Sequence, residues 1–236
     1  MKTIATIVMT LLCTSVWAQP LPQVAPERAG FSSEGLARID RFFAREIEAN
    51  RVPGAVVAIA RDGRLVYYKA HGYLDKSAGT PMPVDAIFQL ASMTKIMVSV
   101  GGLILNEDGR LPLKSPLEQY FPAFAKMNVG LVSKSGEITL QPAKPIYIQD
   151  LFRHTSGITY GGRGNTPVHK LYPAGSSAAA AQYTGEEFIA KLASVPLLHQ
   201  PGTVWDYSFS TDMLGLVIEK VAGKRLNDFL KEAVWD

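Results

Sequence analysis

A serine and a lysine three residues apart are the residues whose types and spacing could do chemistry. Ser92 and Lys95 form a Ser-x-x-Lys motif at the predicted start of a helix, where positions three apart share a face. A serine hydroxyl needs a base, and a lysine amine can serve only if its surroundings lower its pKa. The field at a helix N-terminus favours negative charge on Ser92 and disfavours protonated Lys95. We therefore expect Ser92 to be a nucleophile and Lys95 to be its base, with a lowered pKa.

This spacing is weak evidence by itself. In a chain of this composition, a serine followed three positions later by a lysine is expected about once by chance. The competing interpretation is an N-capping serine with an exposed lysine.

Tyr207 is the second candidate, because it lies on a predicted loop just before a helix. A phenol beside a lysine ammonium can hold negative charge, so Tyr207 could relay a proton between Ser92 and a leaving group. The alternative is a tyrosine that only packs its ring, which is the commoner role of this residue.

Three ordered segments carry a resemblance to a known family. They are residues 88–95 (Phe-Gln-Leu-Ala-Ser-Met-Thr-Lys), residues 150–157 (Asp-Leu-Phe-Arg-His-Thr-Ser-Gly), and the stretch from Pro201-Gly202 through Tyr207-Ser208 to Leu214-Gly215. Together they resemble the beta-lactamase-related serine hydrolases. That group includes class C beta-lactamases, D-alanyl-D-alanine carboxypeptidases and family VIII carboxylesterases.

The resemblance implies a role for each matching residue. Ser92 would be the acylated nucleophile, Lys95 its base partner, and Tyr207 the phenol that shares proton transfer. It also implies an α/β fold of the α+β type, with an antiparallel sheet flanked by helices, a helical lobe, and the site between the two lobes. No metal or organic cofactor is expected. A catalytic pair of His154 and Ser156 is the less favoured alternative, because their segment looks like the family's structural turn and the chain has no Gly-x-Ser-x-Gly elbow.

Two departures from the family pattern bear on function. Class C lactamases usually show Tyr-x-Asn, whereas Phe209 stands at the third position here, which favours an esterase. The family also expects a later Lys-Thr-Gly-like or His-x-Gly-like strand that supplies an oxyanion-hole N–H, and the sequence ends at Asp236 before any such segment. Loss of one oxyanion donor costs about a hundredfold in rate. If the sequence is an inactive fragment, we expect residues 19–236 by themselves to be poorly soluble and to hydrolyse no substrate.

Composition narrows the remaining classes. The 24 Lys and Arg residues exceed the 21 Asp and Glu residues by too little to suggest nucleic-acid binding without a basic block. The four histidines lie far apart without a His-Glu-x-x-His pair, and Cys13 is the single cysteine, so a metal site is not expected. Residues 161–164 (Gly-Gly-Arg-Gly) lack the Lys-Ser/Thr of a phosphate loop and are interpreted as a flexible loop rim.

Residues 1–18 read as a secretory signal peptide. Lys2 gives a positive start, an apolar stretch follows, and Val16 and Ala18 are the small residues that a signal peptidase needs. We expect cleavage near Gln19, a periplasmic or secreted protein, and no stable membrane anchor afterwards. An uncleaved anchor is the alternative, but the apolar run is short for a membrane span.

Hydrophobic periodicity and turn residues predict the elements that would position the site. Helices are expected over residues 31–50, 92–107, 148–154, 184–193, 210–221 and 226–235, strands over 55–60 and 65–70, and a small hairpin near Gly136. Residues 19–236 would form one incomplete domain, in which residues 31–100 start the sheet lobe and residues 101–236 are mostly helical lobe.

The leading hypothesis is a serine hydrolase that forms an acyl-enzyme on Ser92 and acts on short-chain carboxylic esters. A beta-lactamase or D-Ala-D-Ala carboxypeptidase acting on a lactam or peptide is the alternative. A penicillin-binding module that is acylated without turnover, and an inactive fragment, are two further readings. The sequence does not set the oligomeric state.

Overall fold

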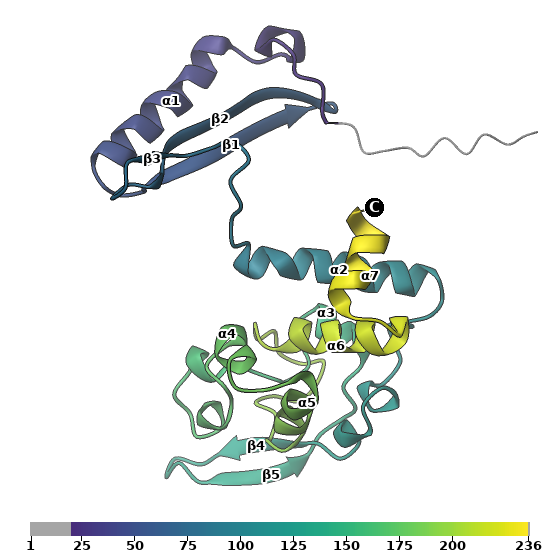
Figure 1. Cartoon of the computed structure of the whole chain (residues 1–236). Helices are drawn as coiled ribbons and strands as arrows, with labels where there is room; N and C mark the ends of the chain where they lie inside the picture. The colour runs from purple at the N-terminus through teal and green to yellow at the C-terminus, as the bar shows by residue number, and fades with distance from the viewer. Residues whose placement is uncertain (1–19, 236) are drawn as a thin grey trace, which may run out of the picture. The chain divides into compact units, whose positions relative to one another are not determined.

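The computed structural model describes residues 20–235. Its contacts divide the chain into two units, and the boundary along the sequence falls between Gln89 and Leu90 (Figure 1). Each unit has a hydrophobic core of its own. The expected signal peptide, residues 1–18, lies outside the described residues. The lobe limits expected at residues 100 and 101 stay a prediction.

The first unit is a helix packed on a small antiparallel sheet. Helix α1 (Ser33–Glu48) lies along the hairpin of β1 (Gly54–Arg61) and β2 (Arg64–Asp75), and β3 (Thr80–Pro81) pairs with the end of β2 (Figure 1). The side chain of Ser32 caps α1 by accepting a hydrogen bond from the Gly35 N–H at 3.1 Å. The predicted helix and hairpin are therefore confirmed.

The turn of this hairpin follows from its residue types. Asp62 and Gly63 both have positive φ, 50° and 68°, which is the backbone of a two-residue type I′ turn. Such a turn matches the twist of the flanking strands, and aspartate and glycine are the residues that tolerate it. The pairing of Arg61 with Arg64 then sets the register of β1 against β2.

The second unit is mostly helical. Its longest helices, α2 (Thr94–Glu107) and α6 (Ser210–Ala222), pack against each other, and the short α3 (Ile148–Phe152) packs on α6 (Figure 1). The remaining elements are the hairpin of β4 (Asn128–Val132) and β5 (Ile138–Pro142) and the helices α4 (Ser176–Ala180), α5 (Gly185–Ala193) and α7 (Leu226–Leu230). A π-helical turn, Lys231–Trp235, follows α7.

The core of the second unit gathers the apolar faces of these elements. Leu105 of α2, Leu151 of α3 and Met213 of α6 are fully buried in it. The antiparallel strands and helices of both units confirm the expected α+β class. The long apolar face of α6 matters for the site, because it fixes the helix that directly follows the Tyr207 loop.

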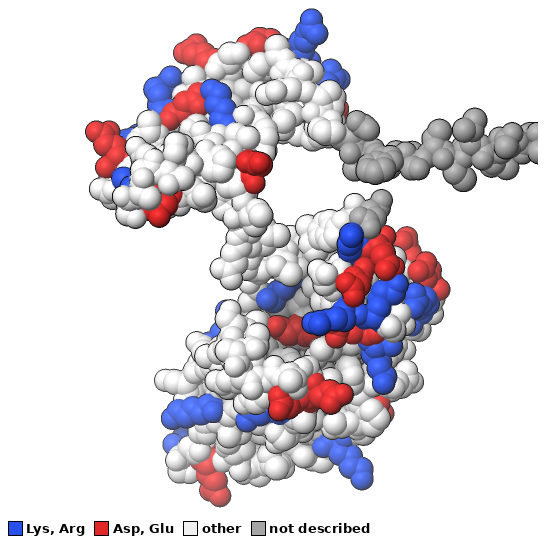
Figure 2. Space-filling view, in the orientation of Figure 1, with Lys and Arg blue, Asp and Glu red and all other residues white. Residues whose placement is uncertain are grey.

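Two structural observations bear on the expected partners. Among residues 20–235, no helix combines the length and the apolar character needed to cross a bilayer. On the face that Figure 2 shows, each unit carries both basic and acidic side chains on a surface that is mostly uncharged.

Candidate active site

Ser92 lies in a short 3-10 turn, Ala91–Met93, which runs directly into α2. The predicted helix over 92–107 is therefore confirmed from Thr94 onward, with Ser92 in the turn that leads into it. Ala91 has a φ of 47°, in the left-handed region that a residue with a Cβ seldom adopts. The chain thus bends sharply just before Ser92, whose side chain is exposed and accessible to a small molecule.

Tyr207 meets Ser92 across more than a hundred residues of sequence. Its hydroxyl donates a hydrogen bond to Ser92 Oγ at 2.6 Å, and Lys95 Nζ lies 5.1 Å from the centroid of the Tyr207 ring. The three residues that the sequence singled out are thus brought together within the second unit. Their chemical roles stay a prediction.

The electrostatics of Lys95 differ from the expectation. Burial, the largest single effect, lowers the pKa of Lys95, but contacts with Tyr207, Tyr160 and Asp212 together outweigh it and raise the pKa above its ordinary value. The predicted lowering of this pKa was wrong, because residues distant in sequence bring phenol and carboxylate oxygens to the ammonium. Lys95 in this structure is a cation at neutral pH.

A second cation faces the same ring. The guanidinium carbon of Arg163 lies 5.6 Å from the Tyr207 ring centroid, and its Nε lies 3.8 Å from an Asp206 carboxylate oxygen. Positive charge next to a phenol favours negative charge on the phenol oxygen. Arg163 was not predicted as a site residue. The sequence places it in the loop 161–164 but gives no sign that it contacts the Tyr207 ring.

The loop that carries Arg163 is pinned by its own backbone. The Gly161 and Gly162 N–H groups donate to the carbonyls of Pro173 and Ala174 at 2.8 and 3.0 Å. A Cβ at Gly161 would lie 2.3 Å from the Tyr172 carbonyl oxygen, so only glycine fits there. These contacts tie the backbone of residues 161 and 162 to the segment 172–174; the predicted flexibility of the loop stays a prediction.

Tyr160 and Asp212 form a layer behind Tyr207. The Tyr160 hydroxyl bonds Ser176 Oγ at 2.9 Å and an Asp212 carboxylate oxygen at 3.3 Å, and its ring packs edge-on to Tyr207. Burial is the main cause that raises the pKa of Tyr160. Sequence reasoning missed both residues. Asp212 carries a weak signal, because it lies inside the Tyr207–Gly215 stretch that contributes to the resemblance.

Phe209, at the position where class C lactamases carry asparagine, is fully buried. Its ring packs edge-on to Tyr160 and Phe188 at centroid distances of 4.4 and 5.1 Å. The residue thus belongs to the core and offers a bound molecule no amide.

The His154 and Ser156 side chains are not brought together as a catalytic pair. Ser156 Oγ is buried, accepts from the Ile158 N–H and bonds Ser210 Oγ at 2.8 Å. His154 instead bonds the backbone of the Tyr207 loop. The buried carboxylate of Asp150 anchors the same turn by accepting from Thr155 Oγ1 at 2.8 Å. These contacts agree with a structural role for the segment 154–157.

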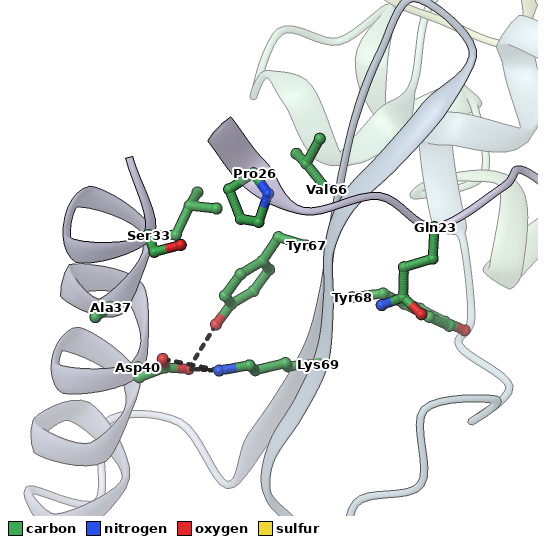
Figure 3. Close-up of a pocket in the computed structure, with 10 residues that line it drawn as sticks. Gln23, Pro26, Ser33, Ala37, Asp40, Val66, Tyr67, Tyr68 and Lys69 are labelled. Carbon is green, nitrogen blue, oxygen red and sulfur yellow. Dashed lines mark hydrogen bonds and ion pairs between the residues drawn. The ribbon is translucent and has the colours of Figure 1, made fainter. Parts of the chain in front are cut away.

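A separate pocket of about 240 Å³ lies in the first unit (Figure 3). Asp40 in its wall accepts hydrogen bonds from the Tyr67 hydroxyl at 2.8 Å and from Lys69 Nζ at 3.0 Å. The bond from Tyr67 is the main cause that lowers the pKa of Asp40. None of the residues predicted for catalysis lines this pocket. Within residues 20–235, no group of three or more His, Cys, Asp or Glu side chains is arranged to hold a metal ion.

Known proteins resemble the chain over most of its length. Esterase EstB of Burkholderia gladioli is 34% identical over 193 residues, covering 80% of this chain and 46% of that protein. A putative D-alanyl-D-alanine carboxypeptidase of Escherichia coli O157:H7 is 29% identical, covering 91% of this chain and 48% of that protein. The chain therefore spans about half the length of these relatives.

Solved structures agree with this relationship. The structure of EstCE1, described as a hydrolase with promiscuous acyltransferase activity, is similar with a TM-score of 0.71 and 30% identity. The match covers 84% of this chain and half of that one. A comparison with protein families matches residues 39–236 to the family described as Beta-lactamase. The chain belongs to the beta-lactamase family.

Proposed function

We propose that the protein is a serine hydrolase that forms an acyl-enzyme on Ser92 and acts on small carboxylic esters. The observation that carries this proposal is the 2.6 Å hydrogen bond between the Tyr207 hydroxyl and Ser92 Oγ, with Lys95 over the same phenol ring. Acyl transfer requires a nucleophile in hydrogen-bond contact with a group that can exchange a proton with it. No metal or cofactor enters the scheme.

In the proposed reaction, Ser92 Oγ attacks the ester carbonyl carbon while its proton passes to the oxygen of Tyr207. For this step Tyr207 must first lose its own proton to solvent and then accept the proton of Ser92, the reverse of the hydrogen bond in the structure; the cations Lys95 and Arg163 that face its ring favour the negative oxygen that this requires. Collapse of the tetrahedral intermediate breaks the bond from the carbonyl carbon to the alcohol oxygen. The departing alkoxide takes the proton back from Tyr207.

Hydrolysis of the acyl-enzyme repeats these steps with water as the nucleophile. Tyr207 takes a proton from the attacking water and returns it to Ser92 Oγ as the acid leaves. Water must reach the ester of Ser92 for this step, and the exposure of that side chain supports such access.

Two observations favour an ester over a lactam or peptide. Relatives named as esterases include EstB and a lovastatin esterase of Penicillium rubens, which is 32% identical. Position 209 carries a buried phenylalanine in place of the asparagine of class C lactamases. The relative named as a putative D-alanyl-D-alanine carboxypeptidase supports the alternative, hydrolysis of a lactam or peptide at the same serine.

We also propose that residues 1–18 direct export and that the protein acts in the periplasm or outside the cell. The positive Lys2, the apolar stretch and the small residues Val16 and Ala18 support this proposal. Detection of a mature N-terminus near Gln19 in the exported fraction would test it.

The experiment on function is a comparison of p-nitrophenyl acetate and nitrocefin hydrolysis by the full chain and by two variants. Ser92→Ala is expected to reduce ester hydrolysis to background, whereas Ser135→Ala, an exposed serine in the β4–β5 turn, should leave it unchanged. Faster turnover of nitrocefin would favour the lactamase alternative. A stable adduct without turnover would indicate a binding module, and full activity in Ser92→Ala would refute the proposal.

A further inference from the structure

His154 contacts the chain on both sides of Tyr207. Its backbone carbonyl accepts a hydrogen bond from the Asp206 N–H at 2.9 Å, and its ring Nδ1 accepts one from the Ser208 N–H at 3.1 Å. Asp206 and Ser208 are the two neighbours of Tyr207 in sequence. A single residue therefore fixes the peptide groups before and after the phenol that bonds Ser92.

The ring of His154 also packs on the phenol itself. The two ring centroids lie 4.7 Å apart with their planes tilted by 36°. On its other side, Nε2 lies 3.3 Å from Thr211 Oγ1 at the start of α6. Because Nδ1 accepts from a backbone N–H, the proton of the neutral ring lies on Nε2 and is donated to Thr211. The hydrogen bond to Ser208 thus exists only while Nδ1 carries no proton.

The backbone at His154 has an unusual conformation. Its φ is 55°, in the left-handed region, which residues other than glycine seldom adopt, although asparagine, aspartate and histidine do so more often than the rest. A residue held there is over-determined by its surroundings, and such positions concentrate at functional sites. Here the surroundings are the two hydrogen bonds from the Tyr207 loop.

We propose that His154 is a positioning residue for the reaction, which in its neutral form holds the Tyr207 hydroxyl against Ser92 and releases it on protonation. This inference rests on the proposed function, because it assigns Tyr207 a part in proton transfer. Protonation would place a hydrogen on Nδ1 facing the Ser208 N–H, so one of the two restraints on the Tyr207 loop would be lost.

The charges around the ring determine when this release occurs. Burial first, and then Lys95 of α2, lower the pKa of His154, and Arg163 acts in the same direction. Asp212 of α6 and Asp206 of the Tyr207 loop oppose them without reversing the shift. The ring is therefore neutral at pH 7, and its protonation belongs to the range below pH 6.5. Activity should fall as the pH drops through that range.

Two substitutions separate the imidazole from the backbone conformation. His154→Gly keeps a residue that accepts φ of 55° but removes the ring, and we expect a loss of about 100-fold in kcat with little change in KM. His154→Asn also tolerates this φ and offers a side-chain oxygen near the place of Nδ1, so it should recover most of the rate. Because asparagine does not titrate, the loss of activity at acidic pH should occur at a lower pH in His154→Asn than in the natural sequence. His71→Asn in the first unit is the matched control, with unchanged rate and pH profile.

A second measurement needs no catalysis. In nuclear magnetic resonance titrations of the full chain, the Ser208 amide and the His154 ring signals should move together, with a midpoint below pH 6.5. A Ser208 amide that ignores His154 protonation would overturn the proposal, as would equal losses in both His154 variants with an unchanged pH profile. If the signals move together but Ser92→Ala retains esterase activity, the proposed function fails while the contact of His154 with the Tyr207 loop stands.

Discussion

At the scale of single residues, the Tyr207 hydroxyl is the group on which the proposed proton transfers depend. It donates to Ser92 Oγ, while its ring is held by His154 and Tyr160 and faced by two cations. The packing contacts of the Tyr207 ring and the proton transfer at its oxygen therefore involve different atoms and can be tested separately. Removing only the oxygen should affect the rate without moving the ring.

Tyr207→Phe is expected to lower kcat by about 100-fold to 10,000-fold, the usual contribution of a positioned proton-transfer group, while KM changes little. Steady-state kinetics with p-nitrophenyl acetate measure both constants. Tyr172→Phe is the matched control. The buried Tyr172 hydroxyl donates a hydrogen bond to the Pro196 carbonyl oxygen at 3.0 Å and makes no hydrogen bond to Ser92. Equal losses in the two variants, or no loss in Tyr207→Phe, would contradict the role of the phenol.

His154 also links stability to pH. Its pKa is lower in the folded chain than the ordinary 6.5, so the unfolded chain binds the proton more readily. Stability should therefore fall as the pH drops from about 6.5 to the lower folded pKa and then level off with respect to this group. The carboxylates with lowered pKa, such as Glu27 and Asp75, act in a separate window below about pH 4.5.

Urea unfolding of the full chain at a series of pH values measures this effect. The free energy of unfolding should decline as the pH falls below about 6.5 in the natural sequence, and the decline should be smaller in His154→Asn. An identical slope in the two proteins would show that His154 is protonated equally in the folded and unfolded states.

At the scale of elements, the turn after α3 joins the site to the core of the second unit. Gly157 has a φ of 81°, and a Cβ there would lie 2.1 Å from the His199 carbonyl oxygen. Asp150, at the buried face of α3, holds the neighbouring Thr155. The turn that presents His154 is therefore fixed by close backbone packing that only glycine permits.

Gly157→Ala is expected to destabilise the chain by more than about 2 kcal/mol, because it combines an unfavourable φ with a clash against backbone. Gly175→Ala is the control, since this glycine has extended backbone and open space around its Cβ position. Thermal and urea unfolding compare the two. A Gly157→Ala variant as stable as the control would show that the backbone around His199 can shift to accommodate a Cβ at position 157 without a cost in stability.

Local elements were predictable because their signals are local. The Asp62-Gly63 turn and the Thr184–Glu187 capping box each depend on residues only a few positions apart, and both occur in the structure. The Ser92–Lys95 spacing is local in the same way, and it predicted that the two side chains share one face at the start of a helix. The charge of Lys95 could not be predicted in this way, because Tyr160 and Asp212 reach it only through the packing of separate segments.

At the scale of the whole molecule, the two units differ in the size of their cores. Among the described residues of the first unit, the buried apolar cluster consists of Leu36, Val66 and Tyr67. The cluster of the second unit extends through α2, α3, α5 and α6 and includes many fully buried side chains. Since burial of apolar surface drives folding, the two units should differ in local stability.

Hydrogen exchange on the full chain is expected to report this difference. Amides of α6, such as those of Val217 and Ile218, should exchange most slowly, and the paired amides of β1 and β2 should exchange faster. Equal protection in the two units would contradict an independent, weaker core in the first.

The family could be recognised from the sequence because its three motifs are short and ordered. The long-range pairing of Tyr207 with Ser92 was a prediction from that resemblance, and spacing by itself could not supply it. Arg163, Tyr160 and the contacts of His154 were not predicted, since they come from loops whose course depends on tertiary packing.

The central claim is that Ser92 is the nucleophile, and covalent labelling tests it most directly. The full chain is treated with a fluorophosphonate probe, digested, and mapped by mass spectrometry. We expect one stoichiometric adduct on Ser92, which is absent in Ser92→Ala and slower to form in Tyr207→Phe. An adduct on another residue, or labelling that persists undiminished in Ser92→Ala, would contradict the claim.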